Sequence, residues 1–121
     1  MSVFLTIPIE NKLYESKSFF LIYDKFPVSP GHILIISKEI KVDYFDLNIQ
    51  EQIELQEMII KAKEIIELKF KPDGYNIGMN CGAVAGQTVM HFHCHLIPRY
   101  DGDMENPRGG IRHCIEGKGY Y

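Results

Sequence analysis

The stretch His91-Phe92-His93-Cys94-His95-Leu96-Ile97 alternates imidazole and apolar side chains. Because successive side chains of a β-strand point to opposite faces, this alternation predicts a strand, which we place at Thr88 to Ile97. Its three histidines then project from one face, separated by two strand rises, or about 6–7 Å. The other face carries apolar side chains that we expect to pack under a helix: Met90, Phe92, Cys94 and Leu96.

Three titratable side chains on one face of a sheet indicate a functional site. Each buried imidazole needs a polar partner, so three in a row are an uncommon structural choice. Two chemistries fit the spacing. Neutral imidazoles are common metal ligands, and a site with three histidines keeps an open position for catalysis. Alternatively, one neutral histidine attacks phosphorus and forms a covalent phosphoramidate. The spacing alone leaves both alternatives open.

Further strands are predicted from apolar runs bounded by turn residues. In the first third of the chain, runs rich in Phe, Ile, Val and Tyr predict strands at Val3 to Ile9, Tyr14 to Tyr23 and Ile33 to Ile36. A fourth strand is predicted at Tyr75 to Asn80, before the small-residue loop 81–86. Because only a short loop joins it to the histidine strand, these two strands should pair antiparallel.

One long helix is predicted between the two groups of strands. Asn48 followed three residues later by Glu51 is typical of a helix start, and apolar residues then recur at helical spacing. We expect the helix to run from about Ile49 to about Lys69 and the fold to be α+β. The apolar band also includes Ile53 and Ile60, so it is wide enough to contribute to a subunit interface.

Length, charge and cysteine content narrow the class of protein. A chain of 121 residues fits one domain. The net charge of −3 and the absence of any Lys/Arg run disfavour nucleic-acid binding. No apolar stretch approaches the roughly 18 residues of a membrane span, so a soluble, cytoplasmic protein is expected. Three cysteines without a C-x-x-C pair indicate reduced thiols and no structural zinc.

The segment Gly86 to Arg99 resembles the signature of the histidine-triad (HIT) family, in which three histidines alternate with apolar residues. The Gly86-Gln87 pair before the triad also follows the family pattern. Upstream, Asp24 with His32 eight positions later is similar to the family's nucleotide-binding strand and turn, and Asn80 falls where the family places a polar contact. The resemblance covers residues 3–100, and it leaves 101–121 as a C-terminal tail expected to pack on or near the active site.

The resemblance implies a five-stranded antiparallel sheet with the long helix packed on it, and a homodimer. It also implies that His93 attacks the α-phosphorus of a nucleotide, forming a nucleotidyl-histidine that water hydrolyses. The backbone carbonyl of His91 would orient the ring of His93 and fix its tautomer. The side chains of His95, Gln87 and Thr88 would donate to phosphate oxygens, where charge develops in the transition state.

The same resemblance assigns nucleotide-binding residues, each with a structural alternative. Asp24 would accept from the ribose hydroxyls, although Asp also caps turns before proline. Asn80 would contact ribose or phosphate, and its alternative is a strand end. Ile22 and Leu34 would stack on the base or simply fill the core. His32 matches the family's upstream histidine, which lies near the triad.

The tail carries two arginines, Arg108 and Arg112, that suit bidentate phosphate contacts, although an exposed polar tail is an equal alternative. No tightly bound cofactor or metal is expected, apart from Mg²⁺ arriving with a polyphosphate substrate.

The leading functional hypothesis is a dinucleoside polyphosphate hydrolase acting on a substrate such as diadenosine tetraphosphate. Its rivals are a nucleoside phosphoramidase, which cleaves a phosphorus–nitrogen bond from AMP, and a non-catalytic nucleotide-binding adaptor. An adenine nucleotide is the expected ligand in each case.

Overall fold

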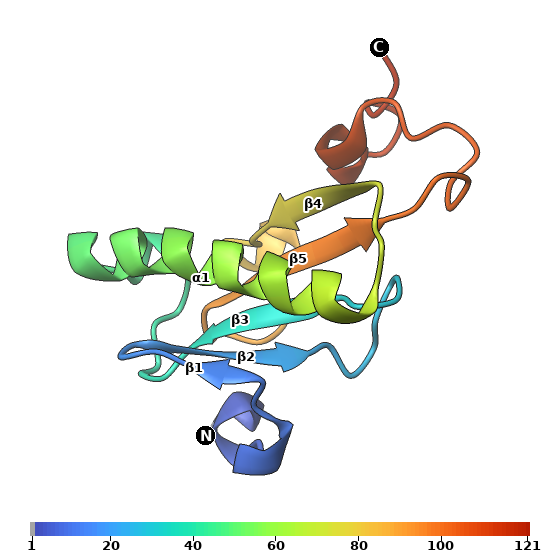
Figure 1. Ribbon diagram of the computed structural model, residues 1–121. Helices are drawn as coiled ribbons and strands as arrows, with labels where there is room; N and C mark the ends of the chain where they lie inside the picture. The colour runs from blue at the N-terminus through green and yellow to red at the C-terminus, as the bar shows by residue number, and fades with distance from the viewer. Residues whose placement is uncertain (1) are drawn as a thin grey trace.

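The computed structural model describes residues 2–121 as a single antiparallel sheet covered on one face by a long helix (Figure 1). The strands are β1 (Tyr14–Glu15), β2 (Phe19–Tyr23), β3 (Ile33–Ser37), β4 (Gly74–Gly78) and β5 (His93–Arg99), and the helix is α1 (Ile49–Lys69). The strand order is β1-β2-β3-β5-β4, with every neighbouring pair antiparallel. The expected five-stranded sheet with one long helix is therefore confirmed, as is the antiparallel pairing of the last two strands.

Short 3₁₀ helices complete the described part of the chain: η1 (Val3–Thr6), η2 (Ile9–Asn11), η3 (Tyr44–Asp46), η4 (Ala83–Ala85) and η5 (Gly110–Cys114). The strand predicted at Val3 to Ile9 is therefore wrong. Ser2 caps η1 by accepting from the Phe4 N–H, and Pro8, which has no N–H to give to a ladder, separates η1 from η2.

The strands predicted at Ile33 to Ile36 and Tyr75 to Asn80 are found within two residues of those bounds, as β3 and β4, whereas two other strand predictions had bounds that were wrong by more. The run Tyr14 to Tyr23 is a hairpin rather than one strand, because its Ser16–Ser18 turn is held by the carboxylate of Glu54, which accepts from the Ser16 hydroxyl and the Ser18 N–H. The histidine strand starts at His93 instead of Thr88, because the preceding loop bonds to neighbouring loops. Phe92 N–H, for example, donates to the Lys41 carbonyl rather than to a strand.

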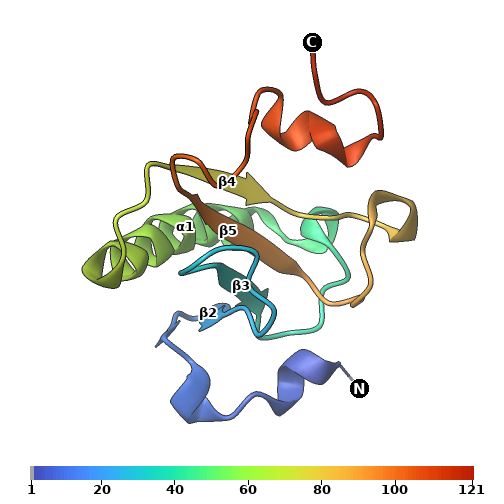
Figure 2. The same ribbon diagram turned by 90° about the vertical axis from the view of Figure 1, so that its right-hand side faces the viewer.

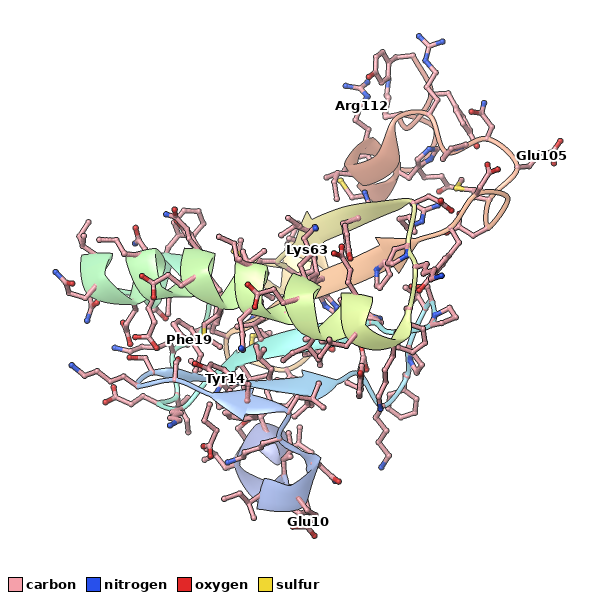
Figure 3. All side chains as sticks on the ribbon, viewed as in Figure 1. Glu10, Tyr14, Phe19, Lys63, Glu105 and Arg112 are labelled. Carbon is pink, nitrogen blue, oxygen red and sulfur yellow. The ribbon has the colours of Figure 1, made fainter. Side chains whose placement is uncertain are left out.

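Helix α1 begins with the predicted capping box, in which Asn48 and Glu51 each accept from the other's backbone N–H. Its buried residues Leu55, Met58, Ala62 and Ile66 pack on the inner face of the sheet. The sheet side of this core includes Phe19, Ile35, Phe92, Cys94 and Leu96, and Figure 3 shows Phe19 between β2 and the helix. Burying a large apolar side chain stabilises the fold by about 1.5–3 kcal/mol, so this layer holds helix to sheet. Met90, expected on this face, is instead 46% exposed.

The opposite face of the sheet carries a second apolar cluster of Phe20, Ile22, Leu34 and Ile36. Phe4 and Ile7 from the N-terminal segment, residues 2–11, pack against it. The N-terminal segment and the C-terminal tail lie at opposite ends of the sheet in both ribbon views (Figures 1 and 2), and Figure 3 shows Glu10 and Arg112 far apart in the same way. The two faces thus have different roles: one is filled by α1, and the other is lined by the N-terminal segment.

The C-terminal tail folds back on itself beside β4. Gly109 has a φ of +96°, and a Cβ added there would clash with the Gly119 carbonyl oxygen. The backbones at these two glycines therefore touch, and only glycine fits position 109. None of the helices in the described residues 2–121 combines the length and apolar character needed to cross a membrane.

Candidate active site

Strand β5 places His93 and His95 on one face of the sheet. Along the strand, half-buried and buried residues alternate, so that Cys94 and Leu96 enter the core while both histidines face the other way. The two imidazole centroids are 5.4 Å apart. His91 precedes the strand and is fully buried beneath the N-terminal segment. Of the three histidines expected on one face of the sheet, His93 and His95 therefore lie at the surface of the candidate site. His91 is buried below the edge of that site.

The ring of His93 is oriented by the backbone of His91. His93 Nδ1 lies 2.8 Å from the His91 carbonyl oxygen, and a carbonyl can only accept, so Nδ1 carries the proton. In a neutral imidazole the lone pair then resides on Nε2. The geometry expected from the sequence is present, and it leaves a nitrogen available for attack on an electrophile.

A second pair of histidines is linked through the loop before β3. Val28 N–H donates to His32 Nδ1 at 3.2 Å, so a neutral His32 carries its proton on Nε2. His32 Nε2 lies 2.9 Å from His95 Nδ1 and donates to it. His95 therefore holds its own proton on Nε2. One backbone amide thus fixes the tautomers of two side chains and leaves His95 as a hydrogen-bond donor.

The buried histidines are neutral near pH 7. Burial, with the nearby His32 and His93, lowers the pKa of His95 to about 4, against an opposing effect of Asp24. Burial also lowers the pKa of His32, although the Asp24 carboxylate raises it. The pKa of His91 is lowered by burial, against its hydrogen bond to the Ser37 carbonyl. Neutral rings are what the tautomer assignments require.

A cavity of about 980 Å³ opens in front of His93 and His95. This is the size of the larger clefts that hold small molecules. Its walls come from the N-terminal segment, from β2 and β3, and from the loop before β5. The predicted residues that line it are Ile22, Asp24, Leu34, Thr88, His93 and His95.

The lining divides into an apolar and a polar part. Ile22 and Leu34 are buried in the second apolar cluster, as the core alternative predicts, and they also border the cavity. Asp24 likewise caps a turn, because its Oδ1 accepts from the Phe26 N–H, while its Oδ2 lies 3.4 Å from His32 Nε2. His32 itself is buried behind His95 and does not line the cavity.

Two predicted contact residues lie outside the cavity. The Gln87 side chain is buried and hydrogen-bonded to backbone groups: its oxygen accepts from Gly82 N–H, and its amide nitrogen donates to the carbonyls of Val42 and Val89. In this geometry the Gln87 side chain stabilises the loop and does not face the cavity as a phosphate contact would. Asn80 is exposed, beyond the end of β4, and does not line the cavity.

The C-terminal tail reaches the histidine face of the sheet but not the cavity. Ile111 approaches Gly78, which is paired with His95. No residue of 101–121 lines the cavity, however. Both guanidinium groups, of Arg108 and Arg112, lie against the Tyr121 ring, 5.0 and 4.7 Å from its centroid.

The site offers one set of side chains that could hold a metal ion. Ligand atoms of Asp24, His32 and His95 lie within 4.8 Å of one another. A metal-bound histidine normally donates its other N–H to an acceptor, which fixes the ring. The hydrogen bonding of His32 is the opposite, because the Val28 N–H donates to its Nδ1. The proton of His32 is therefore on Nε2, the nitrogen that would have to bind the metal. These residues therefore suit a hydrogen-bonded relay better than a metal.

Three residues around the triad were missed by the sequence reasoning. Ser2 Oγ lies 2.7 Å from His91 Nδ1, and the Phe4 ring contacts the rings of His91 and His93 edge-on, at centroid distances of 5.4 and 5.1 Å. A cap-like Ser two residues before Phe4 and the following Pro8 were signals that this segment is not a strand. Val28 acts through its backbone amide, for which the sequence holds no signal.

Comparison with known proteins agrees with this geometry. The HIT domain family matches residues 8–102. The uncharacterised HIT-like protein MG132 of Mycoplasma genitalium is 40% identical over 93 residues, covering 74% of this chain and 64% of that protein. The asymmetrical bis(5'-nucleosyl)-tetraphosphatase of Schizosaccharomyces pombe is 39% identical over 77 residues, covering 64% of this chain and 42% of that protein.

Among solved structures, a HIT family protein from Bacillus anthracis superposes with a TM-score of 0.72 at 39% identity, covering 77% of this chain and 66% of that one. The chain thus spans less than two thirds of the length of these relatives. The family match nevertheless includes both histidine pairs and most of the residues that line the cavity, and it ends two residues into the tail. The chain belongs to the HIT family.

Proposed function

We propose that this protein cleaves a dinucleoside polyphosphate at the α-phosphate, through a covalent nucleotidyl intermediate on His93. The observation that carries this proposal is the His93–His91 hydrogen bond, which leaves an unprotonated nitrogen beside a nucleotide-sized cavity. The similarity to a bis(5'-nucleosyl)-tetraphosphatase supports the choice of substrate class.

The cavity walls suggest how the nucleotide binds. The base lies against the apolar side, where Ile22 and Leu34 border the cavity. The ribose hydroxyls donate to Asp24, two residues after Ile22 on the same side of the site. The α-phosphate then reaches His93, with the exposed Thr88 hydroxyl as a further donor. An adenine nucleotide is the proposed occupant.

The reaction has two steps. The Nε2 lone pair of His93 forms a bond to the α-phosphorus, and the bond from that phosphorus to the bridging oxygen breaks, releasing the rest of the substrate as a nucleotide anion. Water then attacks the phosphorus, the phosphorus–nitrogen bond breaks, and the proton from water passes to solvent. His95 donates from Nε2–H to a phosphate oxygen and stabilises the charge that develops in both steps.

The test is to trap the intermediate. Protein mixed with diadenosine tetraphosphate is quenched in milliseconds to seconds, and intact-protein and peptide mass spectrometry locate the added AMP. The proposal expects an acid-labile adduct on His93. An adduct on His95, or turnover that persists in H93A, would refute the assignment. AMP-amide substrates run in parallel identify a phosphoramidase, and nucleotide binding without either turnover identifies an adaptor.

Partners and setting are part of the same proposal. We propose a homodimer, because α1 exposes Ile49, Ile53 and Ile60, and the edge strand β4 carries Ile77, which is 47% exposed. Mg²⁺ enters only with the polyphosphate, which supplies most of its ligands. The free cysteines Cys81, Cys94 and Cys114 suit a reducing compartment, and we place the activity in the cytoplasm.

A further inference from the structure

Ser2 and His91 join the N-terminal segment to the loop before β5. His91 Nε2 lies 2.7 Å from the Ser37 carbonyl oxygen, which can only accept, so Nε2 carries the proton. His91 is fully buried, and burial lowers its pKa, so the ring is neutral and its Nδ1 is an acceptor. The Ser2 hydroxyl, 2.7 Å from Nδ1, is therefore the donor that completes the hydrogen bonding of this ring.

The same hydroxyl also holds the wall of the cavity. Ser2 Oγ accepts from the Phe4 N–H at 3.2 Å and so caps η1. This cap sets the position of Phe4, whose ring edge meets both His91 and His93 and packs on the second apolar cluster. Val3, Phe4, Thr6 and Ile7 all line the cavity. One side chain thus contacts the wall of the binding site on one side and a triad histidine on the other.

The effect of Ser2 reaches the nucleophile through the His91 backbone. With both ring nitrogens bonded, His91 is held at Ser37 and at Ser2, and its carbonyl is held with it. That carbonyl accepts from His93 Nδ1–H and selects the His93 tautomer. Without the Ser2 hydroxyl, a buried Nδ1 would lose its hydrogen bond, which is costly enough to favour another ring orientation.

We infer that Ser2 is a positioning residue that couples the placement of the N-terminal wall of the cavity to the orientation of the His93 nucleophile. The inference rests on the proposed function, and it extends the site to a residue outside the triad and outside the matched family region, residues 8–102. It assigns Ser2 no contact with substrate. Its action passes through His91 on one side and through Phe4 on the other.

The test compares S2A with S2T and S16A. Alanine removes the hydroxyl, threonine keeps it, and S16A removes a hydroxyl of equal kind that bonds Glu54 at the β1–β2 turn, outside the cavity lining. Folding of each variant is checked by its thermal midpoint. The primary readout is the ring ¹⁵N chemical shifts of His91 and His93, which report the tautomers without any substrate.

S2A should mix the His91 and His93 tautomers, lower kcat about tenfold, in the range expected for a misaligned nucleophile, and raise KM. S2T and S16A should match the native tautomers and kcat. A purely structural role for Ser2 predicts a changed KM with native tautomers and native kcat, and that result overturns the inference. If the native protein turns over no nucleotide at all, the proposed function fails, and the tautomers in S2A alone decide the positioning role.

Discussion

His32 Nε2 donates to His95 Nδ1 across 2.9 Å, although the two residues are 63 positions apart in the sequence. The register of β3 against β5, which pairs Leu34 with His95, brings the end of one strand to the middle of another. The Val28 N–H fixes the tautomer of His32, and His32 in turn fixes the tautomer of His95. A loop amide therefore determines that the proton of His95 is on Nε2. The donor at the reaction centre is therefore set by the fold.

Replacing His32 should separate this positioning from the chemistry. In H32L the Nδ1 of His95 loses its donor, and we expect kcat to fall by up to roughly a hundredfold, the lower end of the range for complete removal of one transition-state donor. In H32Q the side-chain amide can donate from nearly the same place, so kcat should recover in part. Steady-state kinetics of the two variants give the comparison. Equal losses in both would show that only the size of the side chain matters.

Loss of the His93 imidazole should abolish turnover and spare binding. We expect H93A to lower kcat by roughly a thousandfold or more, since a nucleophile cannot be replaced by its neighbours. The affinity for a non-hydrolysable analogue, measured by calorimetry, should stay within about threefold. H113A, which removes an exposed imidazole from the tail, is the matched control and should keep native turnover.

Asp24 should recognise the ribose. The variant D24N keeps an oxygen that can accept from the Phe26 N–H and so keeps the turn, but it loses the charge. We expect KM to rise at least tenfold, as for a lost hydrogen bond to a charged group. A substrate without ribose hydroxyls should be poor for the native protein and nearly unaffected by D24N. Additive effects of the two changes would contradict direct contact.

Stability should fall as the pH is lowered from about 7 toward 4. The folded-state pKa values of His32, His91 and His95 are lowered, that of His95 to about 4, whereas the unfolded chain binds protons near pH 6.5. Between these values the unfolded state holds more protons, so the free energy of unfolding rises with pH, and it levels off above about 7. Urea midpoints at a series of pH values measure this dependence.

The variant H95N provides the control for that experiment. Its urea midpoint should depend less on pH between about 6.5 and 4, because the group with the pKa of about 4 is gone. A native midpoint that is constant across this window would contradict the assignment of neutral, buried histidines.

A charge on the exposed stripe of α1 should break the proposed dimer. Ile53 and Ile60 are 50% and 61% exposed and lie within about 20° of each other around the helix, at about 100° per residue. We expect I53E and I60E to be monomeric by light scattering at concentrations where the native chain is dimeric. L68E, on a residue that is 84% exposed elsewhere on the helix, should leave the mass unchanged. A monomeric native protein would remove the dimer from the proposal.

The parts of the fold that local patterns determine were predictable. Helix α1 has its bounds because the capping box and the apolar period act within the segment itself. The N-terminal segment was mistaken for a strand because its apolar residues, such as Phe4 and Ile7, cover a sheet face rather than join the sheet. β-propensity reports a side chain suited to packing on a sheet, and both arrangements satisfy it.

The candidate site divides along the same line. His93 and His95 were predictable because strand period is a local property, and the resemblance supplied Asp24 and Thr88. The contribution of Val28 could not be predicted from the sequence. Its backbone amide is the same as that of other residue types, and only the conformation of the turn directs it at His32. The resemblance assigned the Gln87 side chain to a phosphate contact, and the sequence does not reveal which backbone groups compete for that side chain.

The three backbone hydrogen bonds of Gln87 tie the loop before β5 to the segment at Val42 and to Gly82. Because Thr88 and Val89 follow directly, this rim of the cavity is already in place before any ligand arrives. The rim loses its conformational entropy during folding, so ordering it does not reduce the free energy of nucleotide binding by much. Association on this side should proceed in one kinetic phase, without a slow rearrangement after collision.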